Sequence, residues 1–146
     1  MFKGRHVHTL DAKGRLSIPS RFREILSTHR EEVLILTNFD GCLAGFPSDE
    51  WELLEEKIRG LSMLQKDVRA FSRYFFSSAQ ECPVDRQGRI LIPPTLREDA
   101  GLEKDIVLLG VANRIEIWSK ARWDAFYRES TENFESIAAK LSDLGM

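Results

Sequence analysis

The pattern of apolar and polar positions along the chain predicts short strands with helices between them. The runs VLIL at 33–36 and IVLL at 106–109 are continuously apolar, which is typical of buried strands. Each is followed by a second strand-like segment, CLAGF or RIEIW, and then by a polar segment with helical spacing, SDEWELLEEKI or SKARWDAFYRES. The pattern therefore indicates an α+β chain in which one set of elements occurs twice.

The chain contains an internal duplication that extends well beyond these strands. The segment DAKGRLSIPSRFR at 11–23 is repeated as DRQGRILIPPTLR at 85–97, an offset of 74. Further along, Trp51 aligns with Trp123 at an offset of 72, so the second half has lost two residues from a loop. Such a match of turn, strand and proline residues does not readily arise by chance.

Each copy of this motif predicts a strand, a tight turn, a second strand and a short helix. Strand-favouring residues on both sides of the turn predict a hairpin in which Gly14 and Gly88 have positive φ. Asp11 and Asp85 are expected to hydrogen-bond the backbone of their own turns. The proline after each second strand suits the start of a helix, and Gly101 marks the end of the second helix.

Two further helices are predicted from apolar residues that recur on one helical face. Ser62 and Gln65 match a capping box at the start of the first, whose apolar face includes Phe71 and Phe75. The second occupies the C-terminus, and its apolar positions are Phe134, Ile137, Ala138, Leu141 and Leu144. We expect both faces to pack against the core, with a partner-binding surface as the alternative.

Composition indicates a globular protein whose two halves depend on each other. The 146 residues are 42% apolar and 30% charged. A half of about 70 residues buries too little surface to be stable alone, so residues 1–76 and 77–146 are expected to interlock about a pseudo-two-fold axis. No apolar run could span a bilayer and no signal peptide is visible, which predicts a cytoplasmic protein with no membrane partner. Cys42 and Cys82 are expected to be buried reduced thiols.

Positive charge is concentrated near the N-terminus, although the whole chain has a net charge of −2. That net charge argues mildly against a nucleic-acid binder, but residues 1–23 contain six lysines and arginines and a single aspartate, so a basic segment precedes an acidic body. Arg15 and Arg89 follow the turn glycine in both copies, where local structure requires no arginine. They predict either an Arg–Asp pair that braces each turn or a tip that contacts DNA phosphates and guanine edges. RNA is disfavoured because no exposed aromatic platform motif is visible.

The sequence gives little support for catalysis or metal binding. Asp11 and Asp85 are related by the duplication, like the two aspartates of aspartic proteases, but they lack the Ser/Thr-Gly that follows those residues. Neighbouring cations would also keep both carboxylates ionised. His6 and His8 alternate as two solvent-facing strand residues do. With no phosphate-binding glycine loop, nucleophile elbow or zinc spacing, we expect no enzyme, no cofactor, no metal and no small-molecule substrate.

The repeated pattern D-x-K-G-R-x-x-[IV]-P-x-x-x-R, just after an MFKG start, resembles the MraZ family of bacterial regulators. The segments RYFFSSAQECPVDRQGRILIPPTLRE and VLLGVANRIEIW are similar to the second half of that family, so the resemblance covers nearly the whole chain. It implies a duplicated AbrB-like (SpoVT-AbrB) fold, in which swapped hairpins interlock in one small β-barrel with peripheral helices. Relatives with one copy per chain must dimerise to complete this fold, whereas duplication makes one chain sufficient.

The resemblance also implies a function. It predicts a sequence-specific DNA-binding transcriptional regulator of the division and cell-wall gene cluster, located in the cytoplasm and associated with the nucleoid. The expected partners are double-stranded promoter DNA and further copies of the chain in a ring-shaped homo-oligomer. Because neighbouring subunits of a ring present their tips in the same sense, the DNA sites are expected to be direct repeats.

The family signature D-x-x-x-R is intact in both copies, although Gln87 stands where the first copy has Lys13. The DNA-binding residues that the motif implies are Asp11, Lys13, Gly14, Arg15, Asp85, Arg86, Gly88 and Arg89, with Lys3 and Arg5 as peripheral candidates. The alternative is an antitoxin-type or structural protein-binding module of AbrB-like fold. An antitoxin usually joins its DNA-binding unit to a disordered tail, whereas this C-terminus predicts an amphipathic helix.

Overall fold

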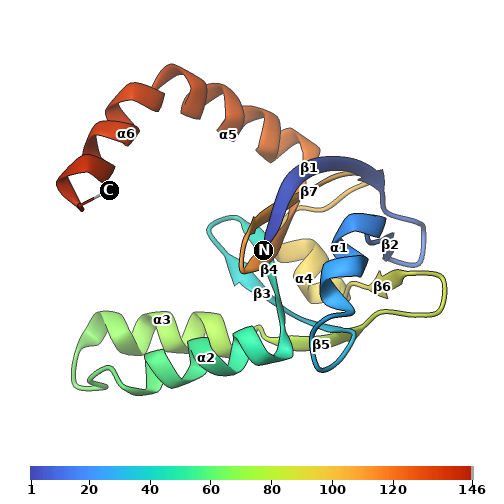
Figure 1. Ribbon diagram of the computed structural model, residues 1–146, viewed down its shortest axis with the longest axis horizontal. Coiled ribbons are helices and arrows are strands. Elements are labelled where there is room, and N and C mark those ends of the chain that lie inside the picture. The colour runs from blue at the N-terminus through green and yellow to red at the C-terminus, as the bar shows by residue number, and fades with distance from the viewer. Residues whose placement is uncertain (146) are drawn as a thin grey trace.

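The computed structural model describes residues 1–145, which form a six-stranded sheet, a two-stranded ribbon and six helices (Figure 1). The elements of the first half are β1 (Phe2–Thr9), β2 (Arg15–Ser17), α1 (Ser20–Leu26), β3 (Val33–Phe39), β4 (Cys42–Pro47), α2 (Ser48–Arg59) and α3 (Lys66–Ser77). The elements of the second half are β5 (Gln80–Pro83), β6 (Arg89–Leu91), α4 (Pro94–Asp99), β7 (Asp105–Ala112), β8 (Arg114–Ser119), α5 (Lys120–Glu132) and α6 (Phe134–Asp143). The α+β class and the duplicated order of elements are therefore confirmed.

The sheet joins strands of both halves in the order β1-β7-β8-β4-β3-β5, and all neighbours are antiparallel. The first-half strand β1 pairs with β7 of the second half, from Phe2 opposite Ala112 to Thr9 opposite Asp105. In the same way β5 pairs with β3, and β2 pairs with β6. Each half thus supplies an edge strand to the other half.

The prediction that the two strands beside each turn pair with one another as a local hairpin is wrong. β1 pairs with β7 and β5 with β3, while β2 and β6 leave the sheet to form the separate ribbon. An isolated two-stranded hairpin is marginal in water, because it has little apolar surface to bury. Pairing across the two halves instead brings Leu16 and Ile90 together at the core.

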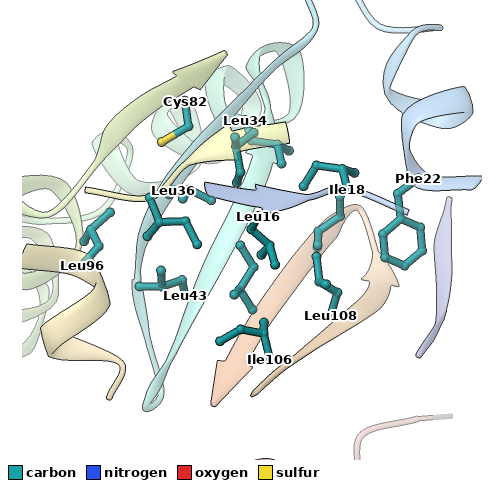
Figure 2. Packing of buried hydrophobic residues seen from close by; sticks show 14 of the residues in the cluster. Leu16, Ile18, Phe22, Leu34, Leu36, Leu43, Cys82, Leu96, Ile106 and Leu108 are labelled. Carbon is teal, nitrogen blue, oxygen red and sulfur yellow. The ribbon is translucent and has the colours of Figure 1, made fainter. Parts of the chain in front are cut away.

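The main core draws on buried residues of both halves. Leu16 and Ile18 of the ribbon side pack with sheet residues such as Leu34, Leu43 and Leu108, all of which are almost completely buried (Figure 2). Burying a leucine or isoleucine contributes about 1.5–3 kcal/mol relative to leaving it exposed. The buried side chains of the ribbon therefore attach it to the sheet.

The helices α2 and α3 cover the other face of β3 and β4. Trp51 and Phe75 stack there with ring centroids 5.2 Å apart, and Phe75 is almost fully buried. α3 begins at Lys66, so the capping box predicted for Ser62 and Gln65 is wrong. Gln65 is the N-cap residue of α3, but its side chain makes no capping hydrogen bond. The Ser62 hydroxyl accepts a hydrogen bond from the backbone N–H of Leu64 in the preceding loop.

The first turns of α5 contact the sheet through aromatic residues, and the rest of the C-terminal helices lies apart from it. Trp118 contacts Trp123 and Phe126 of α5, with ring centroids 5.5 Å and 5.1 Å away, and beyond α5 the chain extends away from the body (Figure 1). The expectation that the α6 stripe packs against the core is wrong, because its apolar residues are exposed, Phe134 at 67% and Ile137 at 43%. None of the helices described is long and apolar enough to cross a membrane.

Candidate nucleic-acid interface

The ribbon formed by β2 and β6 has one buried face and one solvent face. Leu16 lies opposite Ile90 at its centre, and both are buried. Because side chains alternate along a strand, the residues on either side of this pair point outward. On the outer face, Arg15 lies opposite Leu91, and Arg89 lies opposite Ser17. The two arginines are diagonal neighbours on one surface, a relation in which Cα atoms are typically about 7–8 Å apart.

The Asp11 carboxylate accepts three hydrogen bonds within the first turn, two of them from Arg15. One carboxylate oxygen of Asp11 accepts the backbone N–H groups of Lys13 and Arg15, each at 2.9 Å. The other accepts the side-chain Nε–H of Arg15 at 2.7 Å. The backbone bond from Arg15, aided by its guanidinium and by the Lys13 N–H, lowers the pKa of Asp11 to about 2. The carboxylate is therefore ionised at any physiological pH.

The second turn repeats this arrangement. Asp85 accepts the backbone N–H groups of Gln87 and Arg89 at 2.9 Å, and the Nε–H of Arg89 at 3.2 Å. Its pKa is also lowered, chiefly by the backbone bond from Arg89. Side-chain exposure is similar in the two copies, 34% for Arg15 and 28% for Arg89. Both turns thus have the bracing pair that the sequence suggested as one use for these residues.

Bracing does not use the whole guanidinium group. Among the hydrogen bonds and ion pairs made by residues 1–145, the side chains of Arg15 and Arg89 contribute only their Nε–H groups. A guanidinium has five N–H donors, so four remain on the two terminal nitrogens of each arginine. The aspartates therefore fix the direction of each side chain while leaving its outer edge able to bind an acceptor.

The turn glycines are buried against arginines from the opposite half. Gly14 has φ +88° and Gly88 has φ +77°, as the motif predicted. A Cβ at Gly14 would lie 2.7 Å from the guanidinium carbon of Arg97, and a Cβ at Gly88 would lie 2.7 Å from that of Arg23. The backbone angle therefore favours glycine at both turns, and a Cβ would in addition displace the end of an arginine side chain.

Hydrogen bonds across the two halves hold the turns in place. The carbonyl of Gly14 accepts the N–H of Ile92, and the carbonyl of Gly88 accepts the N–H of Ile18, both at 2.9 Å. Each turn is thus fixed by a residue at the end of the other half's ribbon strand. Arg23 and Arg97 were not singled out as site residues from the sequence, although their recurrence at the offset of 74 was a signal that could have identified them.

The remaining candidate residues divide into two groups. Lys13 and Arg86 are exposed at the turns, beside the outer face of the ribbon. Lys3 and Arg5 lie near the beginning of β1, at the end of the strand away from the first turn. The guanidinium of Arg5 lies over the ring of Tyr127 in α5, 4.8 Å from its centroid. The structure therefore brings together the motif residues and does not bring Lys3 and Arg5 to them.

The histidines of β1 and the two cysteines occupy structural positions. His8 Nδ1 is 2.8 Å from the carbonyl oxygen of Ser17, and the His6 ring packs on Phe22 with centroids 5.1 Å apart. Within residues 1–145 no three His, Cys, Asp or Glu side chains are grouped as metal ligands. Cys42 and Cys82 are free and buried, as predicted, and burial raises the pKa of both thiols, that of the latter to about 11.

Comparison with known proteins agrees with this duplicated arrangement. The MraZ family model, whose description adds that it is antitoxin-like, matches the chain twice, over residues 1–74 and 75–144. A protein of Syntrophobacter fumaroxidans is 47% identical over 145 residues, covering 99% of this chain and 97% of its own. Proteins of Ligilactobacillus salivarius and Desulfitobacterium hafniense are 48% and 49% identical over the full length of both chains. All three relatives are named transcriptional regulator MraZ.

The fold and the paired turns define a duplicated α+β protein that presents two braced arginines on one ribbon. The two matches of the family model and the full-length identities of nearly half show that the chain belongs to the MraZ family.

Proposed function

We propose that this protein is a sequence-specific DNA-binding transcriptional regulator that contacts DNA through the outer face of the ribbon and the two adjoining turns. The observation that supports this most directly is that Arg15 and Arg89 lie on one solvent face, each aligned by an aspartate through Nε. A two-stranded ribbon fits the major groove of B-DNA, where arginine binds the O6 and N7 of guanine. The names of the full-length relatives agree with this function.

The geometry favours base reading by the arginines and phosphate binding by the turns. An arginine already fixed through Nε loses little side-chain entropy when its terminal nitrogens bind a guanine. Lys13 and Arg86 lie at the turns on either side, where exposed cations can reach the phosphate backbone. We further propose that the exchange of strands between the halves corresponds to the interlocked swapped-hairpin barrel of AbrB-like proteins.

We assign the promoter of the division and cell-wall gene cluster as the target, on the basis of the family resemblance. The protein would then act in the cytoplasm, associated with the nucleoid. The exposed apolar face of α6 and the exposed aromatic residues of α3, Phe71 and Tyr74, suit self-association. In the ring that we propose, neighbouring subunits read direct repeats spaced by about one helical turn. Binding at several repeats raises the affinity of a chain that is acidic overall.

The central test compares Arg15→Ala with Lys13→Ala in binding titrations on promoter DNA. Loss of Arg15 should cost about 1–3 kcal/mol for each contact, concentrated on particular base pairs. Loss of Lys13 should weaken binding to all sequences and reduce the log–log salt slope by about one for each phosphate contact. An Arg15→Ala protein with normal affinity and unchanged base preference would show that Arg15 only braces its turn.

The spacing of the DNA sites tests the ring. Footprinting on promoters in which one repeat is inverted, or moved by half a helical turn, should show most of the affinity lost in both cases. Full binding to an inverted repeat would contradict subunits that face the same way along the DNA. The measurement needs the mass of the free assembly in the same buffer, so that loss of binding is not confused with dissociation of subunits.

A protein-binding module of the antitoxin type is the second candidate. The description of the family model favours it, and so does the exposed apolar stripe of α6. Against it, the C-terminus is an ordered helix from Phe134 to Asp143 instead of an extended tail. Purified protein that binds no DNA more tightly than random sequence, yet forms a stable complex with another protein through α6, would favour this second function.

A further inference from the structure

The outer face of the ribbon is not symmetric, although the two halves are related by duplication. At the offset of 74 Arg15 corresponds to Arg89, but Ser17 corresponds to Leu91. Leu91 is 58% exposed, so this large aliphatic side chain points to solvent on the surface proposed to bind DNA. Its equivalent in the first half is a small hydroxyl side chain on the same face.

Leu91 lies beside both arginines on the outer face of the ribbon. It is directly opposite Arg15 in the register of the ribbon, and it is two residues from Arg89 on the same face of β6. A ligand that spans both arginines therefore passes beside the exposed Leu91 side chain. On the floor of the major groove the apolar group available to it is the C5-methyl of thymine.

We propose that Leu91 contacts a thymine methyl group, and that the difference between Leu91 and Ser17 gives each subunit's DNA site its direction. This inference rests on the DNA-binding function proposed above. A ribbon with identical outer faces in its two strands would bind a site equally well in either orientation, as a two-fold dimer reads a palindrome. Direct repeats need a subunit that distinguishes the two orientations.

The differences between the two turns contribute less to recognition of the DNA sequence. Ala12 corresponds to Arg86 and Lys13 to Gln87, and all four are exposed at the turns. Contacts from the turns to phosphates position the protein without distinguishing bases. On the outer face of the ribbon, where base edges are within reach, the equivalent positions of β2 and β6 differ in one place. β2 has Ser17 there, and β6 has Leu91.

Replacing thymine by deoxyuracil tests the contact, because it removes only the methyl group. Each thymine of a protected promoter repeat is replaced in turn, and the dissociation constant is measured for the wild type and for Leu91→Ser. Loss of one buried methyl corresponds to about fourfold in affinity. We expect one position per repeat at which deoxyuracil weakens the wild type by about that factor and leaves Leu91→Ser unaffected.

The matched controls exchange the two side chains. Leu91→Ser gives β6 the residue that the first half already carries at the equivalent ribbon position, and its exposed site makes a change in fold unexpected. The double variant Ser17→Leu with Leu91→Ser should move the deoxyuracil-sensitive position to the place related by the pseudo-two-fold axis. Melting temperature and assembly mass are recorded for each variant.

The outcomes separate this inference from the function on which it rests. If the wild type binds promoter DNA no better than random DNA, the proposed function fails. If it binds specifically but deoxyuracil affects the wild type and Leu91→Ser equally at every position, the function stands and the thymine contact is wrong. A change in assembly mass for Leu91→Ser would show that Leu91 belongs to a subunit interface, and would also overturn the inference.

Discussion

Substituting Gly14 by alanine should separate backbone strain from displacement of the arginine that covers the turn. Gly14 has φ +88°, a region that costs an L-residue about 1–2 kcal/mol. For a chain of this size that corresponds to a fall in Tm of roughly 2–8 °C. The new Cβ would also lie 2.7 Å from the guanidinium carbon of Arg97, so that side chain must move.

Gly41 provides a control with nearly the same backbone angle. Its φ is +81°, and no atom lies within 4 Å of the position that a Cβ would take. Gly41→Ala should therefore show the cost of the angle alone, with a similar fall in Tm. Because Gly41 lies between β3 and β4, away from the ribbon, its substitution should leave DNA binding unchanged.

Thermal unfolding and promoter binding are measured together for the two variants. Gly14→Ala should lose affinity beyond Gly41→Ala, because moving Arg97 shifts the turn that carries Arg15. Complete loss of the Arg15 contact would cost about 1–3 kcal/mol, or roughly 5- to 150-fold. Removing the obstructing side chain with Arg97→Ala, in the Gly14→Ala background, should recover part of the affinity if the clash is responsible. Equal binding by the two alanine variants would refute the reasoning that the covering arginine positions the turn.

Three further predictions test the turn, the core and the C-terminal helix. The Asp11 carboxyl should titrate near pH 2 in the folded protein; because this pKa is lowered, its contribution to stability should be present above about pH 4 and be lost as the pH falls toward 2. In Arg15→Ala the backbone bonds remain, so NMR titration should show the Asp11 pKa raised but still below its ordinary value, and an unchanged pKa would contradict a role for the guanidinium. Leu16→Ala should lower the free energy of unfolding by about 2–5 kcal/mol in denaturant titrations, since its side chain is fully buried beneath the ribbon; a loss below 1 kcal/mol would mean that the ribbon is loosely attached. Ile137→Glu on exposed α6 should leave the fold unchanged but reduce the assembly mass in light scattering, and an unaltered mass would exclude this face from self-association.

The sequence predicted those features that depend on a few neighbouring residues. Positive φ at Gly14 and Gly88, and aspartates that bond their own turns, follow from local backbone chemistry. The buried strands β3 and β7 follow from continuous apolar runs. These are properties that a short segment carries wherever it lies in the fold.

Features that depend on distant segments were not accessible in the same way. The apolar pattern of β1 and β2 marks both as strands, but it does not specify which strand edge each one pairs with. Arg23 and Arg97 are typical residues of an exposed short helix, and only the three-dimensional structure shows each one covering the opposite turn. The apolar stripe of α6 predicted a face packed on the core, which is wrong, because amphipathic spacing does not specify which surface, if any, covers a helix.

The exchange of edge strands has a consequence for synthesis on the ribosome. β1 is complete after Thr9, but its partner β7 begins at Asp105, so the strand is made long before it can pair. At about 5–20 residues per second the delay is roughly 5–20 s. During that time the nascent first half has an unpaired strand edge, which could be completed by the same half of another nascent chain. Duplication places the correct partner on the same polypeptide, so its high local concentration favours the monomeric fold as soon as translation ends.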